Sequence, residues 1–91
     1  MWQIIYKKVF LRELKKLPKD VRTEVEEFAF VTLPKTSDPF ALPTIKKLTG
    51  YREYYRVQFG DYRVGLRIDQ HAHLIECCRV KHRKDIYRFF P

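Results

Sequence analysis

The sequence is poor in the residues that mark several common classes of protein. It has only two cysteines, Cys77 and Cys78, and they are adjacent. Neighbouring residues on a strand point to opposite faces, so a disulfide between these two would be strained, and a reducing cytoplasmic interior is expected. No apolar run approaches the ~20 residues of a membrane-spanning helix. The first residues, MWQIIYKK, lack the basic leader and apolar stretch of a signal peptide. We therefore expect a cytoplasmic protein without a membrane partner.

Glycine is scarce too, with three residues in the whole chain. They are scattered, so glycine-rich phosphate loops and nucleophile elbows are absent, and no Ser/His/Asp arrangement is found. His71, His73 and Cys77 fall on one face of an expected strand. One strand cannot wrap a tetrahedral ion and no CxxC pair exists, so we expect neither a metal nor another cofactor.

Positive charge and aromatic residues are what the chain has in excess. Its 91 residues make one domain, and 45% hydrophobic and 15% aromatic residues provide a core. The formal net charge is +8, with a pI near 9.7. Such an excess favours a polyanionic partner, with nucleic acid first, then an acidic protein, then an anionic membrane. A soluble protein that is basic without any such partner is the alternative.

The first half of the chain has helical periodicity. After a short strand over residues 2–7, Phe10, Leu14 and Leu17 recur at the spacing of an amphipathic helix. Pro18 separates it from a second helix, expected over 19–33 and ended by Pro34. So short a connection predicts an antiparallel helical hairpin. A loop with three prolines follows, up to Pro43.

The second half has strand periodicity and is dominated by a hairpin over residues 54–69. Apolar residues alternate with polar ones, so they share one face, while Arg56, Arg63 and Arg67 share the other. Gly60-Asp61 is the expected turn. A short extended piece over 45–48 precedes the hairpin. A last strand over 71–80 lies in the middle of the sheet, and the tail over 81–91 is compatible with one or two helical turns.

These elements predict an α+β domain over residues 1–91. The order is β-α-α-β-β-β, with an N-terminal strand and a helical hairpin packed on a small antiparallel sheet, and a short C-terminal helix possible. The helices must cover the apolar face of the hairpin. The arginine face is therefore expected to stay open.

The open face is the candidate nucleic-acid surface. Arginine suits phosphate because its planar fork donates two hydrogen bonds and keeps its charge. Interleaved tyrosines can stack on unpaired bases at ~1–3 kcal/mol per base. The alternative is a solvated face whose arginines pair with Glu53, Asp69 and Glu76. Cations continue beyond the hairpin at Arg79, Lys81, His82, Arg83, Lys84 and Arg88.

His82 is the histidine inside the basic cluster, and Tyr87 follows five residues later. Histidine titrates near neutral pH, so one on a phosphate-binding surface suits RNA cleavage, in which the 2′-OH attacks and the 5′-oxygen leaves. The alternative is that His82 is a surface residue beside a turn.

Four stretches carry a family resemblance: LRELKKLPKDVR, KLTG, YYRVQFGDYRVGLRID and RVKHRKDIYRFF. In this order they resemble the RelE/ParE superfamily of toxins from toxin–antitoxin pairs, and the RelE branch more closely. The resemblance implies a small, metal-independent endoribonuclease that enters the ribosomal A site and cuts mRNA there. It also implies a cognate acidic antitoxin, and a toxin that is monomeric when free.

The resemblance also assigns site residues. It places the family's catalytic positions on Arg56, Arg63, Arg83 and Tyr87, with His82 as a further candidate. Where the best-known relatives have lysines on the first hairpin strand, this chain has Arg56 and Gln58. Because arginine is a poor proton acceptor, His82 and Tyr87 are the candidates for the base. The expected RNA-binding residues are Lys47, Tyr54, Gln58, Arg67, Arg79, Lys81 and Lys84.

Two other functions remain open from the sequence. A toxin similar to ParE would bind DNA gyrase and cleave no RNA, and its arginines would be surface charge. An inactive toxin kept as a partner or regulator is the second, since the strand lysines are missing.

Overall fold

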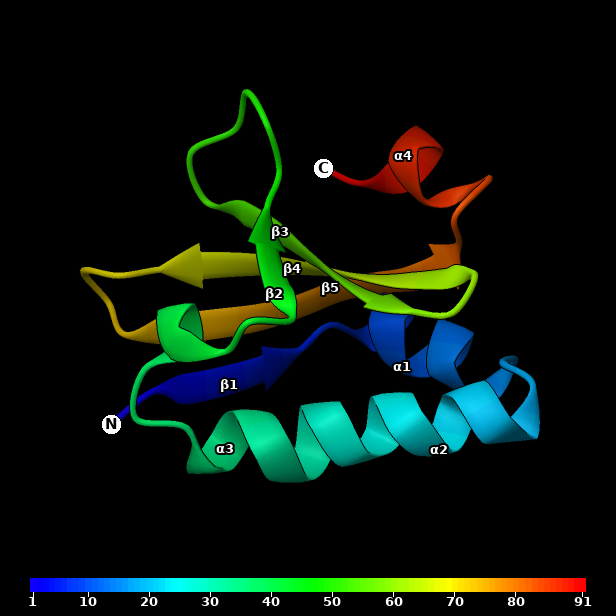
Figure 1. Ribbon diagram of the computed structural model, residues 1–91, viewed down its shortest axis with the longest axis horizontal. Coiled ribbons are helices and arrows are strands. Elements are labelled where there is room, and N and C mark those ends of the chain that lie inside the picture. Colours follow the sequence, from blue (N-terminus) through cyan, green and yellow to red (C-terminus); the bar gives the residue numbers. More distant parts are fainter.

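The computed structural model of the protein describes all 91 residues, with the N-terminal helices on one side of a five-stranded sheet (Figure 1). The helices are α1 (Lys8–Lys15) and α2 (Lys19–Glu27), and α2 continues through a π-helical turn (Phe28–Thr32) into α3 (Leu33–Lys35). The helical hairpin is thus confirmed. Helix continues one residue past Pro34, to Lys35, rather than ending at it, and Pro34 directly follows the π-helical turn.

The sheet has the strand order β1-β5-β4-β3-β2. A single 3₁₀ turn (Pro39–Ala41) interrupts the proline loop before the strands of the second half begin. The strands are β1 (Gln3–Tyr6), β2 (Ile45–Lys47), β3 (Tyr54–Phe59), β4 (Tyr62–Asp69) and β5 (Leu74–His82).

The α+β class is confirmed, with one addition to the expected sheet. β2 to β5 pair antiparallel, but β1 runs parallel to β5, with Gln3 opposite Leu74. β5 is therefore flanked on both sides, as predicted. His71 and His73 lie in the turn before β5 and not on the strand, so the shared strand face predicted for them with Cys77 is wrong. His73 adopts φ of 52°, and its ring stacks on Trp2 at 4.6 Å.

The hairpin of β3 and β4 has the predicted register and turn. Phe59 pairs with Tyr62 across Gly60-Asp61, and Gly60 has φ of 59°, which glycine adopts without strain. The apolar alternate residues of both strands face the helices. They form the main core with side chains from α1, α2 and β5, a cluster of 13 buried residues that includes Phe10, Leu14, Val25, Val64, Leu66 and Ile75.

β5 contains a bulge that was not predicted from the sequence. Leu66 pairs with Cys77 and Gly65 with Arg79, so Cys78 is an extra residue without a partner on β4. Cys77 faces the main core, whereas Cys78 lies in a second cluster on the other face, which confirms that the two thiols point apart. The bulge also resets the alternation, because Arg79 pairs with Gly65 and Lys81 with Arg63. Both cations thereby share the face of the hairpin arginines.

The C-terminal segment covers part of the face that was expected to be open. α4 (Ile86–Phe89) lies on the side of the sheet opposite α2 (Figure 1). Ile86 and Phe90 are buried there with Leu48 and Cys78, and Tyr54 packs against them. The Phe90 ring sits directly on Gly65, where a Cβ atom would come within 2.7 Å of it. The prediction of an open arginine face is therefore wrong for its centre.

No helix is long and apolar enough to cross a membrane.

Candidate nucleic-acid interface

The face of the sheet that carries the arginines is divided into three rows by cross-strand pairing. The first row, nearest the 70–73 turn, joins Tyr54 to Arg67 and Arg67 to Glu76. Arg67 donates to Glu76 at 3.1 Å and to Glu53 at 3.2 Å, and Asp69 lies 4.0 Å away. The hydrogen bond with Glu76 raises the pKa of the Arg67 guanidinium above its usual range. The charge of Arg67 is thus neutralised by the three carboxylates. This agrees, for Arg67, with the alternative prediction that the arginines of this face pair with acidic residues.

The middle row is cationic. Lys46 of β2 pairs with Arg56, Arg56 with Gly65, and Gly65 with Arg79. Neither Lys46 nor Arg56 takes part in any of the eight ion pairs of the molecule. Like charges directly opposite one another destabilise a sheet. An anion bound at this row would relieve that repulsion.

A cleft of about 410 Å³ opens beside Arg56, between the sheet and the C-terminal segment. Tyr87 of α4 lines it together with Arg56, and Tyr51 and Lys47 lie on its other side. The Tyr87 side chain is half exposed because Ile86 and Phe90 hold α4 down while Tyr87 points outward. Two of the predicted catalytic residues, Arg56 and Tyr87, therefore come together although 31 positions separate them in the sequence.

Lys47, one of the predicted RNA-binding residues, lines the cleft and also makes contacts within the protein. Its ammonium group donates to the carbonyl oxygens of Tyr51 at 2.6 Å and Arg52 at 2.8 Å, and it lies 5.3 Å from the centre of the Tyr55 ring. Lys47 therefore holds the turn before β3. Lys46 is the lysine on the arginine face, and sequence reasoning missed it. In the run IKK a shift of one residue decides which lysine faces which side.

The third row lies at the β3–β4 turn and joins Gln58 to Arg63 and Arg63 to Lys81. Arg63 donates to the carbonyl oxygens of Gly60 and Tyr62, at 2.8 and 3.0 Å. Arg83 lies 3.7 Å from the Asp61 carboxylate, with both side chains exposed, so this pair is weak. Arg63 and Arg83 thus both contact the β3–β4 turn, at the end of the sheet next to the middle row. Lys84 is exposed beyond them.

His82 is not brought to the cleft. It pairs with Tyr62 on the face that the helices cover, and their rings meet edge-on at 5.3 Å. Its Nδ1 accepts a hydrogen bond from the Lys84 backbone amide at 3.1 Å. His82 lines a separate groove between α1 and β5. The structure therefore separates His82 from Arg56 and Tyr87 by the thickness of the sheet.

Glu13 of α1 is a second residue that sequence reasoning missed. Its carboxylate accepts from the Arg79 guanidinium at 2.7 and 3.0 Å, from the Val80 amide at 3.1 Å, and lies 3.2 Å from Lys81 Nζ. Burial opposes ionisation of this carboxyl, but these hydrogen bonds outweigh it and lower the pKa of Glu13. Nothing in the sequence connects Glu13 to cations 66 residues away.

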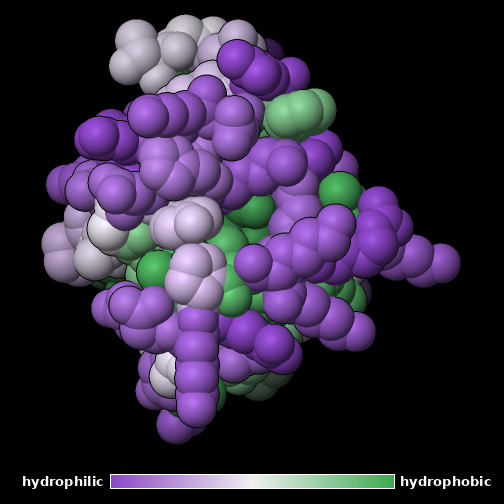
Figure 2. Space-filling model, turned by 90° about the vertical axis from the view of Figure 1, so that its right-hand side faces the viewer, coloured by the Kyte–Doolittle hydropathy of each residue, from purple (hydrophilic) through white to green (hydrophobic).

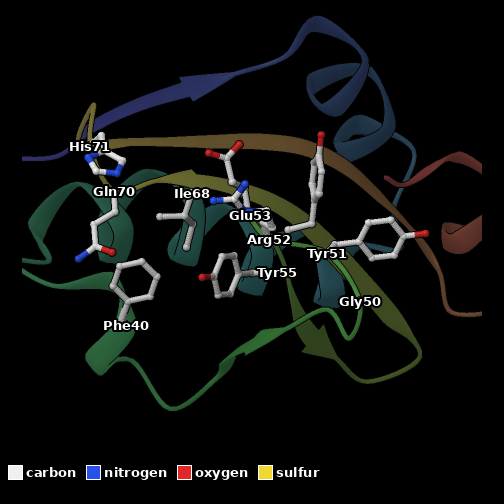
Figure 3. A pocket seen from close by; sticks show the side chains of 10 residues that line it. Phe40, Gly50, Tyr51, Arg52, Glu53, Tyr55, Ile68, Gln70 and His71 are labelled. Carbon is white, nitrogen blue, oxygen red and sulfur yellow. The ribbon is translucent and has the colours of Figure 1, made fainter.

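Seen from the end that carries the β3–β4 turn and α4, the surface is mostly hydrophilic, with small apolar areas between the polar side chains (Figure 2). A larger hollow of about 700 Å³ lies elsewhere, lined by residues of the 50–55 and 68–71 segments and by Phe40 (Figure 3). Of the predicted site residues it contains only Tyr54. No group of three or more His, Cys, Asp or Glu side chains is arranged to hold a metal ion.

Comparison with known proteins gives consistent matches over almost the whole chain. Residues 4–87 match the family described as the ParE toxin of type II toxin-antitoxin system, parDE. Toxin RelE3 of Methanocaldococcus jannaschii is 32% identical over 89 residues, which are 98% of this chain and 99% of the relative. Toxin RelG of Mycobacterium tuberculosis is 36% identical over 77 residues, which are 85% of each chain.

Solved structures agree with these sequence matches. The RelB-RelE antitoxin-toxin complex from Methanococcus jannaschii matches with a TM-score of 0.76 at 32% identity, covering 96% of this chain and 99% of that chain. The toxin-antitoxin complex RelBE2 from Mycobacterium tuberculosis matches with a TM-score of 0.68 at 30% identity, covering 92% and 93%.

The fold and its basic, tail-covered sheet define a small toxin of the type II toxin–antitoxin class. More particularly, the chain belongs to the RelE/ParE superfamily, and its named relatives are RelE-like toxins. The resemblance inferred from the sequence is confirmed.

Proposed function

We propose that this toxin is a ribosome-dependent endoribonuclease that cuts mRNA in the ribosomal A site and so inhibits translation. The observation that carries the proposal is the cleft in which Arg56, free of any ion pair, faces Tyr87. A phosphate needs an uncompensated cation, and a reacting 2′-OH needs a polar group within reach.

The residues divide the chemistry as follows. Arg56, with Lys46 beside it, binds the non-bridging oxygens of the scissile phosphate. The 2′-hydroxyl loses its proton and its oxygen attacks phosphorus, while the bond to the 5′-oxygen breaks. The products are a 2′,3′-cyclic phosphate and a 5′-hydroxyl, whose oxygen takes up a proton. Arg63 and Arg83 stabilise the charge that develops on the phosphate and on the leaving oxygen. Tyr87 orients the reacting ribose and takes part in proton transfer, because His82 lies on the other face of the sheet.

The remaining predicted residues bind RNA around this centre. Positive charge that can bind RNA beyond the cleft comes from Arg79, Lys81 and Lys84. The two ends of the arginine face are marked by Tyr54 and Gln58. Arg67 contributes least, since three carboxylates surround it. We expect cleavage to persist in the presence of a chelator, because the site offers arginine, lysine and tyrosine and no cluster of metal ligands.

The test is cleavage of mRNA on programmed ribosomes together with growth arrest on expression. Arg56→Ala is expected to reduce the cleavage rate by roughly 10²-fold or more and to relieve growth arrest, because charge stabilisation at the reacting phosphate is lost. Arg22→Ala is the matched control, since Arg22 is an arginine of α2 paired with Glu26 at 3.1 Å, far from the cleft in the sequence and on the other layer. Equal toxicity of the two variants would show that the site is wrong.

We also propose a cognate acidic antitoxin as the partner, because the chain carries a net charge of +8 and its structural relatives are toxin–antitoxin complexes. A short acidic reading frame beside the toxin gene, whose co-expression restores growth, would support this. Free toxin is expected to be monomeric by light scattering.

A gyrase inhibitor is the second candidate, favoured by the ParE name of the matching family. It would leave mRNA intact, inhibit supercoiling by purified gyrase and induce DNA-damage signals. Loss of protein synthesis before any DNA damage would favour the endoribonuclease.

A further inference from the structure

Phe89 is an exposed aromatic residue that its buried neighbours keep at the surface. It lies on α4, and 51% of its surface is accessible. Its neighbours Ile86 and Phe90 are buried and fix the short helix on the sheet. The Phe89 ring cannot turn into this small cluster without displacing them. It is therefore held outward.

Two cations lie against the Phe89 ring. The centre of the Arg79 guanidinium is 5.0 Å from the ring centroid, and Lys81 Nζ is 4.8 Å from it. Both cations are fixed from behind by Glu13, at 2.7 and 3.2 Å. One carboxylate compensates two cations, so the group keeps a positive charge. One side of the ring is thus packed against two cations that are held in place by a carboxylate.

No other exposed phenylalanine has this environment. Phe30 is similarly accessible, at 42%, but its ring packs against Tyr6 at 5.0 Å on the helical layer, and no cation lies over it. Phe40 packs against Trp2 and Tyr55. The combination of an accessible ring and clustered cations is specific to Phe89.

The position of Phe89 relative to the cleft follows from helix geometry. Residues two apart on a helix point about 200° away from one another. Tyr87 therefore faces the Arg56 cleft, and Phe89 faces β5 on the opposite side of α4. Arg79 and Lys81 also line a groove of about 410 Å³ between α1 and β5. Its other charged lining residues are Arg12, Glu13, Lys16 and Asp85.

We propose that Phe89, supported by Arg79 and Lys81, is a stacking subsite for an unpaired nucleobase next to the cleavage site. Every base presents a flat face to an aromatic ring, and adjacent cations attract the phosphates on either side of it. The single strand then runs from the Arg56 cleft past α4 toward the cationic groove of α1 and β5. This inference rests on the proposed function, because RNA is the ligand of both sites.

The test uses a short single-stranded RNA with methylated 2′-hydroxyls, which prevents cleavage, and one 2-aminopurine placed at each position in turn. Stacking quenches this base. Wild-type toxin is expected to quench it most at one position, and Phe89→Leu to remove that quenching and weaken binding roughly 10-fold, the factor for about 1.4 kcal/mol of lost stacking. Phe89→Trp should restore both. Phe30→Leu is the matched control and should change neither.

A parallel measurement on programmed ribosomes separates the two claims. Phe89→Leu should raise KM for mRNA with kcat nearly unchanged, since it binds a base and not the reacting atoms. If the wild type quenches through Phe89 but cleaves no mRNA, the proposed function fails and the subsite stands. If the wild type cleaves mRNA but Phe89→Leu binds, quenches and cleaves like it, the subsite is wrong and the proposed function stands. Equal weakening by Phe30→Leu would also overturn the subsite.

Discussion

The two faces of the sheet both bury apolar side chains, but on very different scales. The face under the helices holds a cluster of 13 buried residues from every layer of the domain. The face under the tail holds four, Leu48, Cys78, Ile86 and Phe90, with Tyr54 packed against them. The first is large enough to determine the fold. The second is only large enough to hold the nine residues after β5 (83–91) in place, and that segment carries Tyr87 and Phe89.

This difference separates the main core from the candidate site. Charges gather where burial is slight, because an arginine beside the main core would lose its hydration without a partner. Where cations are partly buried, a carboxylate accompanies them, as Glu13 does for Arg79 and Lys81. Arg56 needs no such partner, since it lies at an open cleft.

The largest expected effect is the loss of stability when a buried side chain of the main core is truncated, compared with one of the cluster under the tail. Leu66→Ala removes a fully buried side chain of the main core and should cost about 2–5 kcal/mol in urea denaturation. Phe90→Ala should cost less than about 2 kcal/mol, because the tail can detach while the rest stays folded. Amide exchange in residues 83–91 should accelerate in this variant alone. A loss as large as that of Leu66→Ala would show that the tail is part of the main cooperative unit.

The next effect concerns activity at the contact between Gly65 and Phe90. Gly65→Ala places a Cβ 2.7 Å from the Phe90 ring, so the ring must leave its place and α4 must shift. We expect mRNA cleavage to fall by roughly 10²-fold, because a displacement of about 1 Å at a reacting group has that cost. The double variant Gly65→Ala/Phe90→Ala relieves the clash and should be no less active than Phe90→Ala alone. Strictly multiplicative losses would contradict this contact.

A smaller effect is the pH dependence contributed by Glu13. The pKa of its carboxyl is lowered in the folded state from 4.5, so its contribution to stability is full above that pH and disappears as pH falls through the lower folded value. Glu13→Gln should reduce stability near pH 7 by about 1–3 kcal/mol and flatten the acid limb of the stability curve. Chemical denaturation between pH 7 and pH 3 measures both. An unchanged acid limb would mean that the carboxyl is not ionised in the fold.

The smallest effect is expected in the alkylation of the two cysteines, one of which lies on each face of the sheet. Burial, followed by the charge of Glu76, raises the pKa of Cys78 to about 11, and burial also raises the pKa of Cys77. Little thiolate is present near pH 7.5, so iodoacetamide should not modify the native protein within hours and should do so rapidly in urea. Mass spectrometry counts the adducts. Faster labelling of Cys78 than of Cys77 would show that the tail opens before the main core does.

Much of the fold follows from periodicity, and most of the site does not. The helix through Phe10 and Leu14 and the hairpin at Gly60-Asp61 were predictable, because each depends on neighbours along the chain. The bulge at Cys78 was not, since strict alternation would have placed Arg79 toward the helices. The choice between Lys46 and Lys47 depends on strand register, which is decided by pairing with β3.

Gly65 and Glu13 illustrate the same limit at longer range. In the sequence Gly65 only interrupts an alternating strand, and the Phe90 ring that explains it lies 25 positions later. Glu13 is one of several polar residues of an amphipathic helix, and its partners lie on β5. Residue type showed that side chains able to bind phosphate were available. Only the tertiary structure shows which of them remain unpaired.

The parallel pairing of β1 with β5 has a consequence for the order of folding. It joins Gln3 to Leu74, so the first strand has no partner until nearly the whole chain is available. Contacts of such high sequence separation slow folding, because a long loop must close before they form. The bond between Glu13 and Arg79 spans a similar distance. Both contacts are therefore expected to form late in folding, after the local helices and the β3–β4 hairpin.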